Sequence, residues 1–331
     1  MIKGYKVKKF FKLFICHAGF SFIGIYSLNS FASDNNLKII IPADKNGGID
    51  YIARKLGEFL NDEKIIKQIQ YENIPGSGAS KGIEEFLKIN TNENSFLIAS
   101  LGAHVNDLQG NLSQDKELLK KLTPLAIISE DYPIIAVSNS SSLKNEEELM
   151  QEFQKNKDKF KVYGGSKVKE IDHINFLLTA KKYDLNSSQV QYVESNGGGK
   201  AFDKFIQDKN GILSTSFSEN IKNIVDQKIK ILAICSDNRL KECPNAPTFK
   251  ELGIPNCLMN YRIIYINSKS PPEKIKFYNN IINKLFTNLN WLYFSKDNHI
   301  INIKVKSNNI PKFIEQKRED IQKIIVSLNE K

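Results

Sequence analysis

Short apolar runs alternate along this chain with amphipathic stretches. Residues 39–41 are three isoleucines, as in a strand buried on both faces, and Ile49, Ile52 and Leu56 then recur at helical spacing. The same change from a strand pattern to a helical pattern begins again at residues 68–71, 161–163 and 189–193, and residues 95–100, 211–215 and 230–235 have the pattern of further strands. Strands that alternate with helices predict parallel sheets with helices packed on their faces.

The first of these transitions, residues 39–54, has two adjacent glycines where the helix begins. The first helical turn, at Gly47 and Gly48, therefore lies open at the end of a strand. Ligands bind at this place in α/β sheets, because free N–H groups and the helix dipole favour an anion. The alternative is a tight turn in which Asp50 only balances the helix dipole. We call such a glycine-containing connection from a strand to a helix a corner. A second corner at residues 71–82, and two more further on, favour the anion site.

The first 32 residues have the pattern of an export signal. Five lysines precede an apolar run at residues 13–28, and Ser30, Phe31 and Ala32 form a small-x-small cleavage sequence. We therefore expect cleavage after Ala32 and a location in the periplasm. An uncleaved membrane anchor is the alternative, which the shortness of the apolar run disfavours.

The rest of the chain has the composition of a globular protein, with 41% hydrophobic and 25% charged residues over all 331 positions. Its length favours two domains. Without the five lysines of the signal, the formal charge falls from +10 to +5. Since there is no dense Lys/Arg tract with interleaved aromatic residues, we expect no nucleic-acid partner.

Sequence motifs for enzymes, metals and cofactors are missing. After the signal, the histidines are His104, His173 and His299, which are far apart and form no H-E-x-x-H pattern, so we expect no metal site. The loop at residues 76–82 lacks the G-K-[ST] ending of a phosphate loop, and we expect no cofactor. A periplasmic enzyme with Asp50 or His173 as acid/base, and a structural or adhesion protein, are the alternatives to a binding protein.

Three of the four cysteines follow the signal, which contains Cys16. Cys235 ends an apolar run, and we expect it to be a buried, inert thiol. Cys243 and Cys257 flank a loop, and in an exported protein they are candidates for a disulfide.

Five motifs resemble those of the solute receptors of tripartite tricarboxylate transporters, the TctC or Bug family of periplasmic binding proteins. The first, PADKNGGIDYIAR, is similar to the family's P-x-x-x-G-G-G-x-D-x-x-A-R, with Asn46 in place of one glycine. The others are NIPGSGASKG, VYG running to His173, YVESNGGGKA and LAICSDNRLKECPNAPTFKELG, which begin at residues 73, 162, 192 and 232. They occur in the family's order and span nearly the whole chain after the signal.

The resemblance implies an α/β fold of the type II periplasmic-binding-protein class, with two α/β lobes and a ligand cleft between them. We expect residues 1–32 to be the signal peptide, 33–134 the first part of lobe 1, 135–235 lobe 2 and 236–331 the second part of lobe 1. It also implies a monomeric solute-binding protein, not an enzyme. Such a receptor captures a small organic carboxylate, such as a di- or tricarboxylate, for the membrane permease subunits of the transporter or for a sensor.

Family members hold the carboxylate through backbone N–H groups, hydroxyls and water, with little use of arginine. The resemblance implies the following ligand-binding residues in this sequence: Asn46, Gly47, Gly48, Ile49, Asp50, Ser77, Gly78, Ala79, Ser100, Gly102, Gly165, Ser166, His173, Asn196, Gly197, Gly198 and Ser216. Among them, we expect Asp50 to hold the first loop in shape. Ile49 stands where the family commonly has Thr or Ser, and Glu194 where proline is usual. These two departures from the family pattern have two possible consequences: the pocket binds a different acid, or it has lost the ability to bind a ligand.

Overall fold

A computed structural model describes residues 36–254, 256–297, 300 and 309–329. The expected signal peptide, its cleavage after Ala32, Cys16 and His299 lie outside these residues. Within them, no helix is long and apolar enough to cross a membrane.

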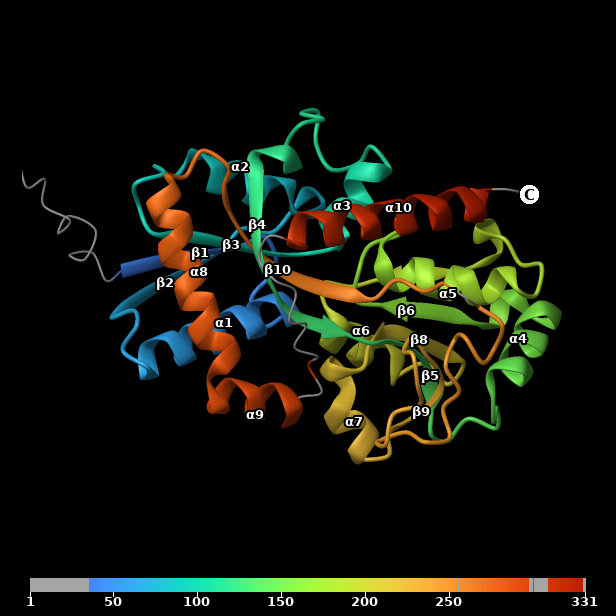
Figure 1. The fold of residues 1–331 in the computed structure, drawn as a ribbon. Coiled ribbons are helices and arrows are strands. Elements are labelled where there is room, and N and C mark those ends of the chain that lie inside the picture. The colour runs from blue at the N-terminus through green and yellow to red at the C-terminus, as the bar shows by residue number, and fades with distance from the viewer. Residues whose placement is uncertain (1–35, 255, 298–299, 301–308, 330–331) are drawn as a thin grey trace, which may run out of the picture. The chain divides into compact units, whose positions relative to one another are not determined.

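Two five-stranded sheets form the framework (Figure 1). The first sheet has the order β2–β1–β3–β10–β4 and consists of β1 (Asn36–Ile41), β2 (Gln68–Asn73), β3 (Ser95–Ser100), β4 (Leu122–Asp131) and β10 (Asn260–Asn267). The second has the order β7–β6–β8–β5–β9 and consists of β5 (Pro133–Ser138), β6 (Lys161–Gly164), β7 (Tyr192–Glu194), β8 (Gly211–Ser216) and β9 (Ile229–Ile234). We call each sheet with its helices a lobe.

In each sheet one strand runs against the other four. β1 pairs in parallel with β2 and β3, whereas β10 pairs antiparallel with both β3 and β4. In the second sheet β6 pairs in parallel with β7 and β8, whereas β5 pairs antiparallel with β8 and β9. The expected all-parallel sheets are therefore mixed, because β5 and β10 are the strands with which the chain enters a sheet from the other one.

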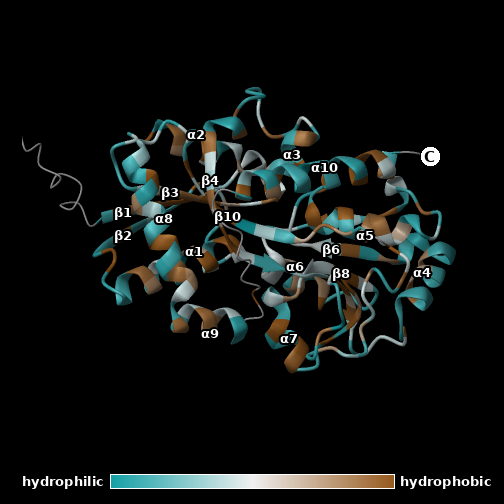
Figure 2. Cartoon of the chain, in the orientation of Figure 1, coloured by the Kyte–Doolittle hydropathy of each residue, from teal (hydrophilic) through white to brown (hydrophobic). Residues whose placement is uncertain are grey.

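Ten α-helices are described, and they cover the faces of both sheets. They are α1 (Gly48–Asp62), α2 (Ser80–Lys88), α3 (Gly102–Leu108), α4 (Glu146–Lys155), α5 (Ile171–Lys181), α6 (Gly198–Phe205), α7 (Ile221–Val225), α8 (Pro272–Thr287), α9 (Leu289–Asp297) and α10 (Ile310–Asn329). Helices such as α8 and α10 carry polar and apolar stretches in turn, as expected of helices that bury one face (Figure 2).

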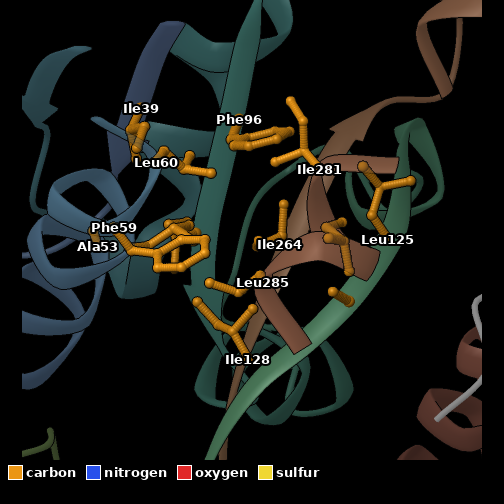
Figure 3. Packing of buried hydrophobic residues seen from close by; sticks show 14 of the residues in the cluster. Ile39, Ala53, Phe59, Leu60, Phe96, Leu125, Ile128, Ile264, Ile281 and Leu285 are labelled. Carbon is orange, nitrogen blue, oxygen red and sulfur yellow. The ribbon is translucent and has the colours of Figure 1, made fainter. Parts of the chain in front are cut away.

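The first sheet has a hydrophobic core on each face. On one face Ile39 and Phe96 pack with residues of α1 and α8 (Figure 3). The fully buried Trp291 of α9 belongs to the same core. On the other face Ile40 and Leu97 pack with α2, α3 and α10. Adjacent residues of β1 thus enter opposite cores, which confirms the prediction that this strand is buried on both faces.

The second sheet is covered in the same way, by α4 and α5 on one face and by α6 on the other. Phe249 and Ile254 belong to the core under α4 and α5, and Ile234 forms a parallel bridge with Thr248. The segment after residue 235, expected in lobe 1, therefore packs on the second sheet. The chain rejoins the first sheet only at β10.

The cysteine pairing differs from the expectation. Cys235 and Cys257 form a disulfide with their Cα atoms 6.0 Å apart, and Cys243 is free. The expected Cys243–Cys257 pair and the expected free thiol at Cys235 are both wrong. The reason is packing, because the segment that carries Cys257 returns along the end of β9, where Cys235 lies in the same core.

Candidate functional site

A cavity of about 460 Å³ lies between the two sheets, at the ends of the strands that run in parallel. Six connections from a strand to the following helix line it: β1 to α1, β2 to α2, β3 to α3, β6 to α5, β7 to α6, and β8 to the short helix Ser218–Asn220. Corners of this kind present backbone N–H groups to a ligand.

Most of the expected ligand-binding residues line this cavity. They are Gly47, Gly48, Ile49, Gly78, Ala79, Ser100, Gly102, Gly165, Ser166, Asn196, Gly197, Gly198 and Ser216. Asn46, Asp50, Ser77 and His173 lie outside the lining. The corners that the sequence pattern predicted are thus brought together from both lobes.

Asp50 holds the first corner in shape from below the cavity. Its carboxylate, only 1% exposed, accepts hydrogen bonds from the Asn46 N–H (2.9 Å), from Arg54 Nε (3.1 and 3.0 Å) and from Asn73 Nδ2 (2.9 Å). Burial raises the pKa of Asp50, but these bonds outweigh it and lower the pKa below its ordinary value. Asn46 itself has a φ of 65°, a left-handed conformation that asparagine tolerates better than most residues.

The first turn of α1 faces the cavity without a side-chain cap. Gly47 is its N-cap and makes no side-chain hydrogen bond, and Gly47, Gly48 and Ile49 all line the cavity. The first N–H groups of a helix have no partner within the helix, and they carry the positive end of its dipole. This corner of lobe 1 is therefore suited to an anion.

His173 supports the β6–α5 connection from outside the cavity. Its Nδ1 accepts the Lys169 N–H at 2.9 Å, and its ring stacks on Tyr192 with 4.3 Å between the centroids. Burial, and then the charge of Lys169, lower the pKa of His173 to about 4, so the ring is neutral at pH 7. Lys169 has a φ of 64°, and the hydrogen bond from its N–H to His173 stabilises this backbone conformation. His173 was expected to contact the ligand, but here its Nδ1 makes this hydrogen bond to the backbone.

Two carboxylates of lobe 2 accept hydrogen bonds from backbone N–H groups that were expected to bind the ligand. Asp172 Oδ2 accepts the N–H groups of Gly165 and Ser166, each at 2.9 Å. Glu219 Oε2 accepts the Gly198 N–H at 2.8 Å. Burial raises the pKa of Asp172 to about 7, with a further rise from the charge of Glu219.

Arg262 lies on β10 in the floor of the cavity and is 3% exposed. Its Nη2 is 3.3 Å from Glu219 Oε1, and its Nη1 is 3.5 Å from Asp131 Oδ2. Asp131 ends β4 and also accepts the N–H and the hydroxyl of Ser218. Because Arg262 and Asp131 belong to the first sheet and Glu219 to the second lobe, these charges tie the lobes together at the point where β4 continues into β5.

Further contacts cross the cavity mouth. Asn106 of α3 donates to Glu170 Oε1 at 2.8 Å, and Lys200 Nζ of α6 is 3.7 Å from Asp44 Oδ2. A Cβ atom built on Gly197 would lie 3.6 Å from the Gly47 Cα. The glycine corners of the two lobes therefore almost touch, and the lobes are closed around the cavity.

The family model described as the tripartite tricarboxylate transporter family receptor, TctC, matches residues 109–329, more than half of the chain. The chain belongs to this family. A relative from Pseudomonas sp. (strain P51), described as a UPF0065 protein in the tcbD-tcbE intergenic region, is 20% identical over 250 residues, covering 74% of this chain and 72% of the relative.

Solved structures with the same fold include the periplasmic binding protein BugD, with a TM-score of 0.77 and 15% identity over 89% of this chain and 97% of its own. Rpa4515 of R. palustris, solved with adipate, has a TM-score of 0.78 and 15% identity over 89% of this chain and 97% of its own. MatC from Rhodopseudomonas palustris, solved with bound malate, has a TM-score of 0.76 and 15% identity over 88% and 98%. The expected type II periplasmic binding fold and TctC/Bug family are thereby confirmed, and the chain is a solute-binding receptor of a family of periplasmic receptors.

The sequence reasoning missed the charged residues of this TctC receptor's cavity, above all Asp172, Glu219 and Arg262. One signal was available for Arg262, because a lone charge inside the apolar strand β10 needs an opposite charge nearby. Asp172 and Glu219 had no such signal, since acidic residues in the first turn of a helix are common.

Proposed function

We propose that this TctC receptor is exported to the periplasm, where it binds a small organic acid between its lobes and presents it to the permease subunits of a tripartite tricarboxylate transporter or to a sensor. The observation that carries the proposal is the cavity itself. It joins six strand-to-helix corners, and the uncapped first turn of α1 opens into it.

The size of the cavity agrees with this proposal. Ligand sites for small molecules occupy roughly 300 to 1,000 Å³, and this one has about 460 Å³. A micromolar complex requires about 8 kcal/mol of binding free energy, whereas one helix N-terminus supplies roughly 0.3 to 2 kcal/mol. Several corners must therefore act on the same ligand, which closure of two lobes makes possible.

In this proposal the first lobe offers backbone donors of Gly47, Gly48 and Ile49 to the acid, with Ser100 and Gly102 at the floor. The second lobe contributes the hydroxyls of Ser166 and Ser216 and the side-chain amide of Asn196. The signal peptide ends at Ala32, so the mature receptor begins at Ser33. The receptor acts as a monomer.

An enzyme that uses Asp50 or His173 as acid/base has less support. Asp50 is saturated with hydrogen bonds and His173 packs on Tyr192, and neither residue lines the cavity. A general acid or base has to come within hydrogen-bonding distance of its substrate. Solute-binding relatives also favour a receptor that releases its ligand unchanged.

A thermal-shift screen of the purified protein against mono-, di- and tricarboxylates and amino acids tests the proposal. The panel includes malate and adipate, the acids present in two related structures. An acid at a hundred times its dissociation constant adds about 2.7 kcal/mol of stability, which raises the melting temperature visibly. No shift with any compound at millimolar concentration contradicts the receptor function.

The Gly48→Val variant tests the position of the site. A Cβ atom on Gly48 would lie 2.1 Å from Glu219 Oε1 and 2.6 Å from Arg262 Nη2, both at the ends of flexible side chains. We therefore expect the variant to fold but to lose at least tenfold in affinity, because closure brings these groups against the added side chain. Gly199→Val is the matched control, since a Cβ atom there meets nothing within 4 Å. Unchanged affinity in Gly48→Val contradicts the assignment of this corner.

A further inference from the structure

Most of the acidic side chains in the cavity lining belong to the second lobe, namely Glu170, Asp172 and Glu219. In lobe 1 the N–H groups at the start of α1 have no side-chain cap. In lobe 2 the corresponding N–H groups of Gly165, Ser166 and Gly198 already hold carboxylates of the chain itself. These three N–H groups of the second lobe are therefore already occupied, and an anion faces the carboxylates of Asp172 and Glu219 there.

Asp172 is the clearest example, because it is a buried carboxylate without a cation. It lines the cavity, is 6% exposed and makes both of its carboxylate hydrogen bonds through Oδ2. No lysine, arginine or histidine of the described chain forms an ion pair with it, and Oδ1 has no hydrogen-bond partner there. Its charged neighbours in the β6–α5 connection and on the facing element are Glu170 and Glu219, and Tyr192 lies beside it on β7.

Arg262 does not compensate this negative charge. Its guanidinium already faces two carboxylates, Asp131 and Glu219. The cavity lining as a whole contains four acidic side chains, Asp44, Glu170, Asp172 and Glu219, against two basic ones, Lys167 and Arg262. This excess of acidic over basic side chains disfavours a ligand that carries only carboxylates at a pH where the acidic groups are charged.

Two polar atoms of the cavity lining have no hydrogen-bond partner in the described chain. They indicate a ligand that both donates and accepts hydrogen bonds. In the part of the chain that is described, Asn260 Oδ1 and Arg262 Nε are buried without a hydrogen-bond partner, and both residues line the cavity. They are two residues apart on β10 and therefore share one face of the strand. The amide oxygen requires a donor and the guanidinium N–H requires an acceptor, since buried polar groups are normally paired.

We propose that the cavity selects a small amino acid, whose carboxylate binds at the start of α1 and whose ammonium group pairs with Asp172, over the acid of the same skeleton that lacks the amino group. This inference rests on the proposed receptor function and names its ligand class. The ammonium group supplies the missing cation beside Asp172. The first lobe and the remaining donor of Arg262 serve the carboxylate.

Isothermal titration calorimetry with matched ligand pairs tests the inference. Aspartate differs from malate by an ammonium group in place of a hydroxyl, and 2-aminoadipate differs from adipate by one added ammonium group. The titrations are run at pH 8, above the pKa of Asp172 of about 7, where its carboxylate is mostly charged. We expect the amino member of at least one pair to bind at least tenfold more tightly than its partner.

The Asp172→Asn variant shows whether Asp172 causes the preference. Asparagine has nearly the same shape and keeps an oxygen for the Gly165 and Ser166 N–H groups, but it removes the charge. We expect the preference for the amino member to fall at least tenfold. Asp203→Asn, at an exposed position of α6, is the matched control and keeps the preference.

The outcomes separate this inference from the receptor function. Tight binding of malate or adipate with weaker binding of the amino partner overturns the inference and leaves the receptor function standing. A preference for amino acids that survives in Asp172→Asn overturns the role of Asp172. Binding of none of the four ligands, nor of any other acid or amino acid in the thermal-shift panel, contradicts the inference together with the receptor function.

Discussion

Gly165 lies where two corners of lobe 2 are in backbone contact, and its replacement by alanine gives a sharp test of how the site is built. A Cβ atom on Gly165 would lie 2.5 Å from the Gly198 nitrogen, 2.7 Å from the Gly197 carbonyl carbon and 2.9 Å from the Gly198 Cα. All three atoms belong to the backbone, so no side chain can turn away. The Gly197 N–H also donates to the Gly165 carbonyl at 2.8 Å, which binds the two corners together.

The cost of Gly165→Ala follows from the required movement. Ordinary van der Waals contacts begin at about 3.4 Å, so the β6–α5 and β7–α6 corners have to separate by about 0.9 Å. Overpacking of this kind costs roughly 1 to 3 kcal/mol. For a protein of this size we expect a melting temperature lower by roughly 2 to 5 °C. Ligand affinity falls as well, because the separated corners no longer converge.

Gly199→Ala is the control for this substitution. Gly199 lies one residue further into α6, and a Cβ atom there meets nothing within 4 Å. Alanine in a helix is favoured over glycine by up to about 1 kcal/mol, so we expect this variant to be equally or more stable than the parent. Urea unfolding of both variants measures the difference. A Gly165→Ala protein within 0.5 kcal/mol of the parent would refute the reasoning.

Three further predictions concern charge and cross-linking. Cys235→Ser removes the disulfide and should lower the stability to unfolding by about 2 to 4 kcal/mol, whereas Cys243→Ser should change it by less than about 1 kcal/mol; equal effects in thermal melts contradict the observed pairing. Asp50→Ala leaves three donors without their acceptor and should cost roughly 3 kcal/mol in urea unfolding; a loss below 1 kcal/mol is inconsistent with its role. Burial raises the pKa of Asp172 to about 7, so the native state holds this proton more tightly than the unfolded state and loses stability as pH rises from about 4 to about 7. Asp172→Asn should therefore gain stability relative to the parent between pH 5 and pH 8, by at most about 1.4 kcal/mol per pH unit, and an unchanged difference between urea curves at the two values contradicts this.

The strands and corners of the fold were accessible from the sequence because their signals are local. The isoleucines of β1, the helical spacing that starts at Gly48 and the glycines at 197–199 each report on the backbone around them. Since parallel strands bring their carboxyl ends to one edge, these local signals also predict that the corners meet. Most of the expected site residues accordingly line one cavity.

The direction of β10 and the disulfide partner of Cys235 were not accessible, because they depend on contacts between distant segments. β10 pairs with strands that lie more than 120 residues earlier in the chain, and nothing in its own apolar pattern distinguishes parallel from antiparallel pairing. Likewise, the spacing of three cysteines leaves their pairing open until the path of the loop is known.

The charges of the cavity were inaccessible for a different reason. Asp172 and Glu219 resemble ordinary acidic residues near helix starts, and only their position against Gly165 and Gly198 gives them a role. His173 lies outside the cavity lining, and its Nδ1 accepts the Lys169 N–H, so its position beside a glycine loop did not show which role it has.

The position of β10 between β3 and β4 has a consequence for how the chain reaches its native state. β3 ends at residue 100 and β4 at residue 131, but the strand that joins them begins at residue 260. While the chain is being synthesised, the second sheet is complete about 25 residues before β10 emerges. Until then β3 and β4 each present an open edge, which is prone to pair with another chain. The nascent chain thus passes through a stage in which its second sheet is complete and its first sheet, still without β10, needs protection from aggregation.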